Sequence, residues 1–326
     1  MTKNMTATAV AHPNIAFIKY WGNQNEVLRI PVNNSISMNL AGLETRTTVT
    51  FTDSFKQDSL SINGDTVKES GLSRVSKMLD HVRKTAGITL FAQVESKNNF
   101  PTGSGIASSA SAFAALAVAS SSAAELTLSE KELSRLARTG SGSASRSVSA
   151  GFVEWYAGSD HQSSYAASSA PPEHWDLADC IAVVSDTHKA TGSTGGHALA
   201  PTSPLQLARV ADATRRMDIC RSALLNKDFP TFANIVELDS NMMHAVMMSS
   251  EPNLFYWDPP TIEIMQAVQR WRAKGQAVCY TIDAGPNVHV LCKAELKEKV
   301  AQQLENIPGV KKVLTANPGG PAQIIN

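Results

Sequence analysis

The spacing of apolar and polar positions predicts strands and two helices in the first half of the chain. Alternating or apolar runs indicate strands at residues 48–51, 88–94 and 151–155. The alanine-rich stretch at residues 108–126 predicts a buried helix whose small side chains allow close backbone approach. Ser129 and Glu132 have the spacing of a capping box, so a second helix is expected to begin there and to end at Gly140.

The second half alternates helix and strand patterns after a predicted loop, rich in Ser, Ala and Pro, at residues 159–172. Short apolar runs predict strands at residues 180–184, 278–282 and 288–292. Helical patterns occupy residues 205–225, 229–248 and 261–274, and a further helix has Leu296, Val300 and Leu304 on one face. This order favours an α+β domain with its helices on one face of an antiparallel sheet.

The length of the chain indicates two domains, because 326 residues exceed the usual size of one hydrophobic core. No long linker separates two halves of the sequence. We place the boundary just before the apolar run at residue 180. The prediction is an N-terminal domain at residues 1–179 and a C-terminal domain at residues 180–326.

Composition excludes several classes of protein. The 29 basic and 29 acidic residues balance, so the basic excess typical of a nucleic-acid-binding protein is missing. The four cysteines are widely spaced, which argues against a disulfide framework or a zinc site. The first ten residues lack the pattern of a signal peptide, and the small apolar run at residues 112–119 is too short to span a bilayer. We therefore expect a cytoplasmic protein that binds neither nucleic acid nor membrane.

A glycine- and serine-rich segment at residues 101–110, with the sequence PTGSGIASSA, leads directly into the alanine-rich helix. Such a turn exposes backbone N–H groups, and the helix N-terminus adds positive potential, so the segment can bind phosphate. Ser104, Ser108 and Ser109 could bond phosphate oxygens or hold Mg²⁺. The GK[ST] ending of a Walker loop is missing. The alternative is a plain turn that caps the helix.

Three further segments place charged side chains in unusual surroundings. Arg146 follows a second Gly/Ser turn at residues 140–145, and its guanidinium could pair with a carboxylate or phosphate or simply lie on the surface. Lys19 follows an apolar run and needs an anionic partner, unless it extends to solvent from a strand end. Asp283 ends an apolar strand, where it could act as a general base or stabilise a turn.

In this order, these segments resemble the mevalonate diphosphate decarboxylase family of the GHMP kinase superfamily. The resemblance also includes residues 14–22, 151–155, 241–245 and 280–287, and it covers nearly the whole chain. It implies a two-domain α+β fold of GHMP type. The N-terminal domain would be ribosomal-protein-S5-like, the C-terminal domain ferredoxin-like, and the active site would lie in the cleft between them.

The resemblance also implies a reaction. ATP phosphates would lie on the glycine-rich loop with Mg²⁺, and Asp283 would remove the proton of the substrate 3-hydroxyl as it attacks the γ-phosphoryl group. Departure of the 3-phosphate and of CO₂ would then form an alkene. Lys19 would keep Asp283 ionised, and Arg146 would orient the departing carboxylate.

Further positions match the ligand contacts of the family. The expected ATP-binding residues are Gly103, Ser104, Gly105, Ala107, Ser108 and Ser109, with Ser108 and Ser109 as the candidate Mg²⁺ ligands. The expected substrate-binding residues are Asn14, Tyr20, Ser141, Gly142, Ser143, Lys189, Ser193, Thr194 and His197. Family members often form dimers, so a homodimer is expected, although no stretch of the sequence identifies an interface.

Two positions depart from the family pattern. Asn23 stands where a lysine usually follows Tyr-Trp-Gly, and Thr194 stands where an arginine aligns. Each lost charge-assisted hydrogen bond is worth about 1.5–3 kcal/mol, so two losses would weaken diphosphate binding by roughly two orders of magnitude or more. The sequence therefore predicts that mevalonate 5-phosphate is decarboxylated to isopentenyl phosphate. The alternatives are a mevalonate 5-diphosphate decarboxylase, with Lys189 as a compensating cation, and a 3-kinase that releases no CO₂.

Overall fold

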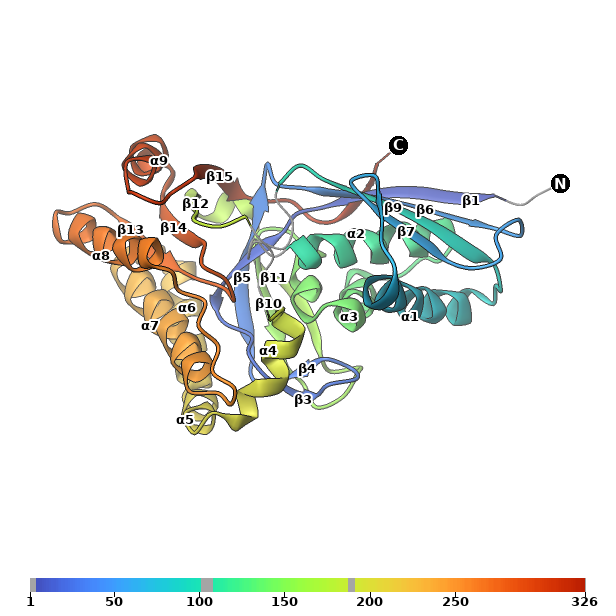
Figure 1. Cartoon of the computed structure of the whole chain (residues 1–326), viewed down its shortest axis with the longest axis horizontal. Coiled ribbons are helices and arrows are strands. Elements are labelled where there is room, and N and C mark those ends of the chain that lie inside the picture. The colour runs from blue at the N-terminus through green and yellow to red at the C-terminus, as the bar shows by residue number, and fades with distance from the viewer. Residues whose placement is uncertain (1–3, 101–107, 187–190, 326) are drawn as a thin grey trace.

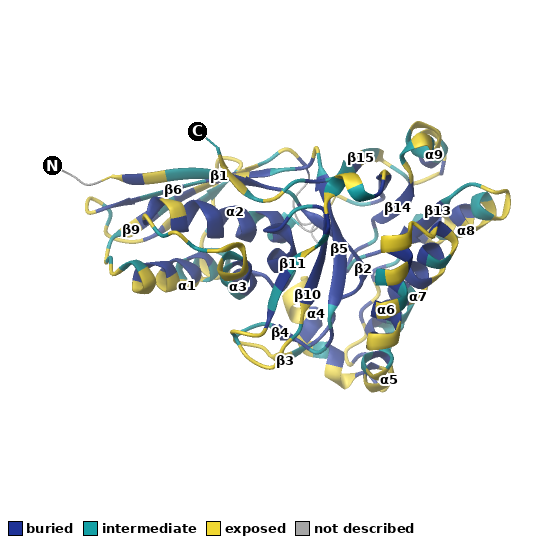
Figure 2. Cartoon of the chain, turned by 180° about the vertical axis from the view of Figure 1, so that it is seen from behind, coloured by how far each residue is buried: buried dark blue, intermediate teal, exposed yellow. Residues whose placement is uncertain are grey.

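The computed structural model describes residues 4–100, 108–186 and 191–325. A six-stranded sheet combines strands from the first hundred residues with β16 from the C-terminal end, and three helices back it (Figure 1). The strand order is β16 (Gln323–Ile325), β1 (Met5–Ala11), β6 (Thr45–Thr52), β9 (Phe91–Asn98), β7 (Ser59–Ile62) and β8 (Asp65–Thr66). The helices are α1 (Glu69–Ala86), α2 (Ser108–Ala123) and α3 (Glu130–Gly140). Helix α2 packs directly on the sheet, and Figure 2 shows it largely buried.

A second, eight-stranded sheet runs through the centre of the molecule and takes strands from both halves of the chain. Its order is β11 (Tyr165–Ala170), β10 (Phe152–Tyr156), β5 (Ser35–Ala41), β15 (Lys312–Pro318), β12 (Leu177–Val183), β14 (Val288–Lys293) and β13 (Val278–Thr281), and β2 (Asn14–Ile18) also pairs with β5. A small hairpin is formed by β3 (Asn23–Asn25) and β4 (Ile30–Pro31). The predicted domain boundary at residue 180 falls within β12, and the division at this residue stays a prediction.

The helices of the second half cover both faces of this sheet, so the expectation of helices on one face was wrong. They are α4 (Ser193–Leu199), α5 (Gln206–Ala211), α6 (Ala213–Asn226), α7 (Phe229–Met248), α8 (Pro259–Ala273) and α9 (Lys297–Glu305). Cys180 packs with α8 and α9, whereas its neighbour Ile181 packs with α6 and α7. Successive side chains of a strand point to opposite faces, so the fully buried strand β12 requires a helical layer on each side.

The structure confirms several predicted elements and corrects others. The capping box is present, because Ser129 N donates to Glu132 Oε2 over 2.8 Å and Glu132 N donates to Ser129 Oγ over 3.3 Å. The predicted loop at residues 159–172 contains strand β11, where Ala166 lies opposite Trp155 of β10. A small residue opposite a large aromatic ring favours this pairing despite the low strand propensity of alanine. The predicted helix at residues 205–225 is interrupted at Asp212.

The four cysteines are buried and form no disulfide, as expected from their spacing. Within the described ranges, no helix is long and apolar enough to cross a membrane.

Candidate functional site

A cavity of about 380 Å³ lies where the end of β2, the end of α3 with the following 3₁₀ helix η1 (Gly142–Ser147), and the turn after β13 meet. Residues from both halves of the chain line it: Ala16, Lys19, Tyr20, Trp21, Arg29, Arg74, Ser108, Ser109, Ser141, Gly142, Ser143, Arg146, Gly192, Ser193, Thr194, His197, Met243, Asp283 and Ala284. This set includes most of the residues that the sequence singled out. Its charged members are four cations and one carboxylate, so the cavity suits an anionic ligand.

Lys19 and Asp283 form an ion pair at one end of the cavity, with 2.6 Å between Lys19 Nζ and Asp283 Oδ1. The Lys19 side chain is only 1% exposed, whereas that of Asp283 is 28% exposed and remains accessible to a ligand. Burial raises the pKa of Asp283, but the charges of Lys19 and His289 outweigh this effect and lower it overall. Burial lowers the pKa of Lys19, and the neighbouring Asp283 opposes that change.

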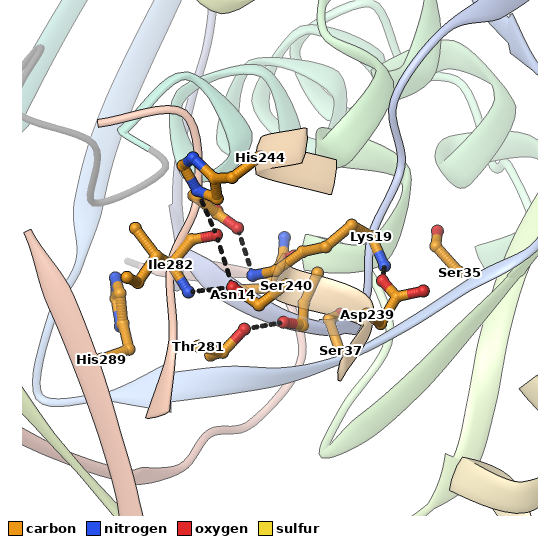
Figure 3. Close-up of polar contacts among 12 residues, drawn as sticks. Asn14, Lys19, Ser35, Ser37, Asp239, Ser240, His244, Thr281, Ile282 and His289 are labelled. Carbon is orange, nitrogen blue, oxygen red and sulfur yellow. Dashed lines mark hydrogen bonds and ion pairs between the residues drawn. The ribbon is translucent and has the colours of Figure 1, made fainter. Parts of the chain in front are cut away.

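Helix α7 fixes the backbone next to both members of this pair, and Figure 3 shows its Asp239 bonded to Lys19 and its Ser240 bonded to Ile282. Lys19 N donates to Asp239 Oδ2 over 2.6 Å, and Arg216 Nε donates to Asp239 Oδ1 over 2.7 Å. In the turn that carries Asp283, Ile282 N donates to Ser240 Oγ over 3.0 Å. Both members of the ion pair therefore come from backbone that is fixed by the same helix.

Arg146 lies in the 3₁₀ helix η1 (Gly142–Ser147) and is 3% exposed. Its guanidinium donates to three neutral side chains: to Ser35 Oγ over 2.5 Å, to Ser37 Oγ over 3.1 Å and to Asn14 Oδ1 over 3.2 Å. Burial lowers its pKa to about 10, so it stays charged at neutral pH. No carboxylate among the described residues forms a salt bridge with Arg146, which leaves its charge available to an anion.

Asn14, a predicted substrate-binding residue, lies behind Arg146 and does not line the cavity. Its Oδ1 accepts from Arg146, and its Nδ2 donates to Ser147 Oγ over 2.8 Å. The structure thus places Asn14 where it fixes the orientation of the guanidinium.

Tyr20 forms part of the cavity wall together with the Ser141–Gly142–Ser143 turn. Its hydroxyl donates to Asn23 Oδ1 over 2.5 Å, and Asn23 Nδ2 donates to Glu26 Oε2 over 2.9 Å. Asn23 thus bridges two side chains where the family pattern has a cation. A Cβ on Gly142 would lie only 2.6 Å from the Tyr20 ring, so glycine is required for this close approach.

His197 lines the cavity but is held by aromatic neighbours. Its ring stacks on Tyr20 with 4.0 Å between centroids, and its Nδ1 accepts from Gly22 N over 3.0 Å. Burial and the charge of Arg29 lower its pKa to about 3. His197 is therefore a neutral ring at physiological pH, and Ser193 and Thr194 lie on the same helix, α4, at the cavity wall.

Ser108 and Ser109 open helix α2 and line the cavity near Ser141, with 3.2 Å between Ser109 Oγ and Ser141 Oγ. Five predicted ligand contacts, Gly103, Ser104, Gly105, Ala107 and Lys189, lie outside the described residues. Within the described part of the chain, no cluster of three or more His, Cys, Asp or Glu side chains could hold a metal ion. Mg²⁺ bound to phosphates keeps most of its ligands from phosphate and water, so two serine hydroxyls and one carboxylate suit such an ion.

Two cations of the cavity were missed in the sequence. Arg74 comes from α1 and donates to Gly140 O over 2.7 Å, and Arg29 comes from the β3–β4 hairpin and donates to Thr139 O over 3.2 Å. Arg74 lies on α1 among many other polar residues, and no local sequence pattern marks this arginine as a cavity residue. Arg29 lies six residues after Asn23 in the same hairpin, which is the one signal that could have drawn attention to it.

Comparisons with known proteins agree with this geometry. Two family models match: the diphosphomevalonate decarboxylase-like N-terminal domain over residues 11–166, and the mevalonate 5-diphosphate decarboxylase C-terminal domain over residues 180–319. The diphosphomevalonate decarboxylase of Candida albicans is 38% identical and aligns over 95% of this chain and 92% of its own length.

Solved structures of mevalonate diphosphate decarboxylases are also similar to this chain. Mevalonate diphosphate decarboxylase from Staphylococcus aureus is 38% identical, with a TM-score of 0.93 over 99% of both chains. A structure of MDDEF in complex with MVAPP, AMPPCP and magnesium is 36% identical, with a TM-score of 0.93 over 99% of this chain and 100% of the other. These likenesses confirm the expected two-domain α+β fold of GHMP type.

The buried contact of Asp239 generates a stability prediction. Asp239→Asn should lower the free energy of unfolding by about 3–5 kcal/mol, because it leaves the fully buried Arg216 charge without its inner partner. Asp212→Asn is the matched control, since Asp212 pairs with the same arginine but is 33% exposed, and should cost about 1 kcal/mol or less. Urea unfolding measures both, and equal losses would contradict the importance assigned to Asp239.

A second prediction concerns the contact between Gly142 and Tyr20. Gly142→Ala should displace the Tyr20 ring and weaken ligand binding by about tenfold or more, because the added carbon has no room beside a buried ring. Gly195→Ala is the control, since an added Cβ there meets only Thr191 at an ordinary 3.5 Å. Calorimetric titration with the substrate measures the effect, and unchanged affinity in Gly142→Ala would refute the proposed close packing.

Proposed function

The chain belongs to the diphosphomevalonate decarboxylase family, and we propose that it catalyses the ATP-dependent decarboxylation of mevalonate 5-diphosphate. The products are isopentenyl diphosphate, CO₂, ADP and phosphate. The observation that carries the proposal is the 2.6 Å contact of Lys19 with Asp283 in a cavity that also contains Arg146. A base, a cation beside it and a second cation for a carboxylate are the groups that this reaction requires.

Asp283 is the general base of the first step. One of its oxygens is held by Lys19, and its partial exposure lets the carboxylate reach a ligand. It takes the proton of the 3-hydroxyl group as that oxygen bonds to the γ-phosphorus of ATP, and ADP leaves. Lys19 offsets the negative charge that develops beside it.

Arg146 directs the second step. The 3-phosphate leaves with the electron pair of the C3–O bond, and the electrons of the bond to the carboxyl carbon form the alkene as CO₂ departs. Before that step the carboxylate must be held in one orientation, and a guanidinium fixed by Asn14, Ser35 and Ser37 can hold it through two parallel bonds.

ATP and Mg²⁺ fit the serine-rich side of the cavity. The MDDEF complex with AMPPCP and magnesium supports this assignment. The N-terminus of α2 favours negative charge, and Ser108 and Ser109 line the cavity at this point, where their hydroxyls could contact phosphate oxygens or the ion. When bound, Mg²⁺ neutralises charge on the phosphates during transfer.

Decarboxylation of mevalonate 5-phosphate is the second candidate, and the loss of cations at Asn23 and Thr194 favours it. Two observations support the diphosphate instead. The curated relatives are named for the diphosphate substrate. In addition, Arg29 and Arg74 line the same cavity, so the two uncharged positions do not by themselves determine its charge.

The direct test is CO₂ release from each substrate with ATP and Mg²⁺. We expect release from mevalonate 5-diphosphate with a higher kcat/KM than from mevalonate 5-phosphate. A higher value for the monophosphate would contradict the proposed substrate and support the charge-loss hypothesis. ADP formation from both substrates without CO₂ would indicate a 3-kinase and contradict both candidates.

The pH dependence of kcat/KM tests the role of Asp283. Because its pKa is lowered overall in the protein, the acid limb should lie below the ordinary carboxyl value near about 4. In Lys19→Met, the positive charge that lowers the pKa of Asp283 is removed while burial still raises it. The pKa of Asp283 therefore rises, and the acid limb moves to higher pH. Lys19→Arg keeps the charge and should shift the limb less. An unchanged limb in Lys19→Met would mean that another group is the base.

A further inference from the structure

The two arginines missed in the sequence converge on one helix end. Arg29 Nε donates to Thr139 O over 3.2 Å, and Arg74 Nη2 donates to Gly140 O over 2.7 Å. These carbonyls belong to the last two residues of α3, where the helix dipole favours positive charge. The end of α3 leads directly into the Ser141–Gly142 turn, which lines the cavity. Both arginines therefore line the cavity as well.

Neither arginine has an acidic partner among the described residues. Within the described ranges, Arg29 donates a hydrogen bond through Nε but through neither terminal nitrogen, and the buried Nε of Arg74 has no partner. Burial and the repulsion from Arg29 lower the pKa of Arg74 to about 10. Two neighbouring cations without a counter-charge are unfavourable, and an anion bound between them would remove that repulsion.

Arg29 also has an unusual backbone. Its φ is 51°, in the left-handed region that non-glycine residues rarely adopt. It ends the turn between β3 and β4, where Leu28 N donates to Asn25 Oδ1 over 2.9 Å. A strained residue persists only where its surroundings enforce it, and such residues concentrate at ligand sites.

Arg29 lies on the α3 side of the cavity, because its Nε bonds Thr139 O at the end of that helix, whereas Asp283 is paired with Lys19 in the turn after β13. Arg29 lowers the pKa of His197 and Arg74 and opposes the rise in the pKa of Tyr20. The strongest influences on Asp283 are instead burial, Lys19 and His289. The Tyr20 ring lies beside Gly142, two residues after the end of α3, so Tyr20 and Arg29 line the same side of the cavity.

We propose that Arg29 binds the terminal phosphate of the substrate's diphosphate, as one side of a cationic clamp completed by Arg74. This inference rests on the proposed function and identifies how the cavity accepts a diphosphate. Asn23 bonds Tyr20 and Glu26 instead of carrying a charge, and Arg29 supplies a cation from the other side of the same hairpin. Its free fork of N–H donors suits two phosphate oxygens.

The test compares the dissociation constants of mevalonate 5-diphosphate, mevalonate 5-phosphate and ATP, each titrated separately by calorimetry. Arg29→Gln should weaken diphosphate binding by about 10- to 100-fold, the value of one charge-assisted contact, and monophosphate binding by less than about threefold. ATP binding should stay within about twofold. Arg270→Gln is the matched control, because it removes an exposed arginine paired with Glu263 and should change none of the three.

Two further variants separate a binding role from a structural one. Arg29→Gly relieves the left-handed strain while removing the side chain, so it should fold at least as well and still lose diphosphate affinity. Asn23→Lys in the Arg29→Gln background should restore much of that affinity, because it returns a cation to the same hairpin. If Arg29→Gly alone bound the diphosphate as tightly as the unchanged protein, the inference would be overturned.

The outcomes distinguish this inference from the proposed function. Equal losses for both mevalonate esters, or a loss for ATP instead, would overturn the assignment of Arg29 to the terminal phosphate. Because the titrations need no turnover, they report on Arg29 even if no CO₂ is released. A chain that binds the diphosphate through Arg29 but decarboxylates neither ester would refute the function and leave the binding site intact.

Discussion

The burial of the Lys19 ammonium group is the constraint on which the rest of the structure depends. A lysine that is 1% exposed loses most of its hydration, and only a close carboxylate makes its charged form tolerable. Asp283 provides that carboxylate from the turn after β13, more than 260 positions away in the sequence. Arg209 donates to Lys19 O over 2.8 Å, and Asp239 accepts from Lys19 N, so the backbone at Lys19 is fixed as firmly as its side chain. The ion pair therefore joins the two halves of the chain at the point where chemistry is proposed.

This constraint divides the cavity into two parts with different polar chemistry. At the reacting end, every charged group is either paired or held by neutral hydroxyl and amide groups, as Lys19 and Arg146 show. A site of this kind needs little rearrangement when charge develops, which is the main source of rate in phosphoryl transfer. On the α3 side, Arg29 and Arg74 donate to backbone carbonyls, Arg74 also lies over the Phe113 ring, and no described carboxylate forms a salt bridge with either arginine. The first arrangement favours a transition state, and the second favours ligand binding.

The sequence was sufficient for local features and for side chains whose burial is chemically unusual. The capping box at Ser129, the bounds of α7 and the isolated charges of Lys19, Arg146 and Asp283 could all be found from neighbouring residues. The strand β11 could not, because its pairing with β10 depends on a large residue, Trp155, that meets alanine across the sheet. The two-sided helical cover of β12 was missed for a similar reason, since a fully apolar strand does not reveal which residues meet which helix. Arg29 and Arg74 enter the cavity through contacts with the end of α3, and no sequence spacing encodes that convergence.

The comparison of Asn23 with Arg29 shows why counting charges along a sequence is a weak guide to substrate choice. In the sequence alone, each uncharged family position counts as a lost contact. In the folded chain, Asn23 has a definite alternative role, because it accepts from Tyr20 and donates to Glu26 and so orders the hairpin. The residue that faces the cavity is on the other side of that hairpin, and its cation acts on Tyr20, His197 and Arg74. A ligand responds to the potential within the cavity, whichever strand supplies the charge. In this hairpin the uncharged Asn23 and the cationic Arg29 therefore have to be considered together when the charge of the cavity is assessed.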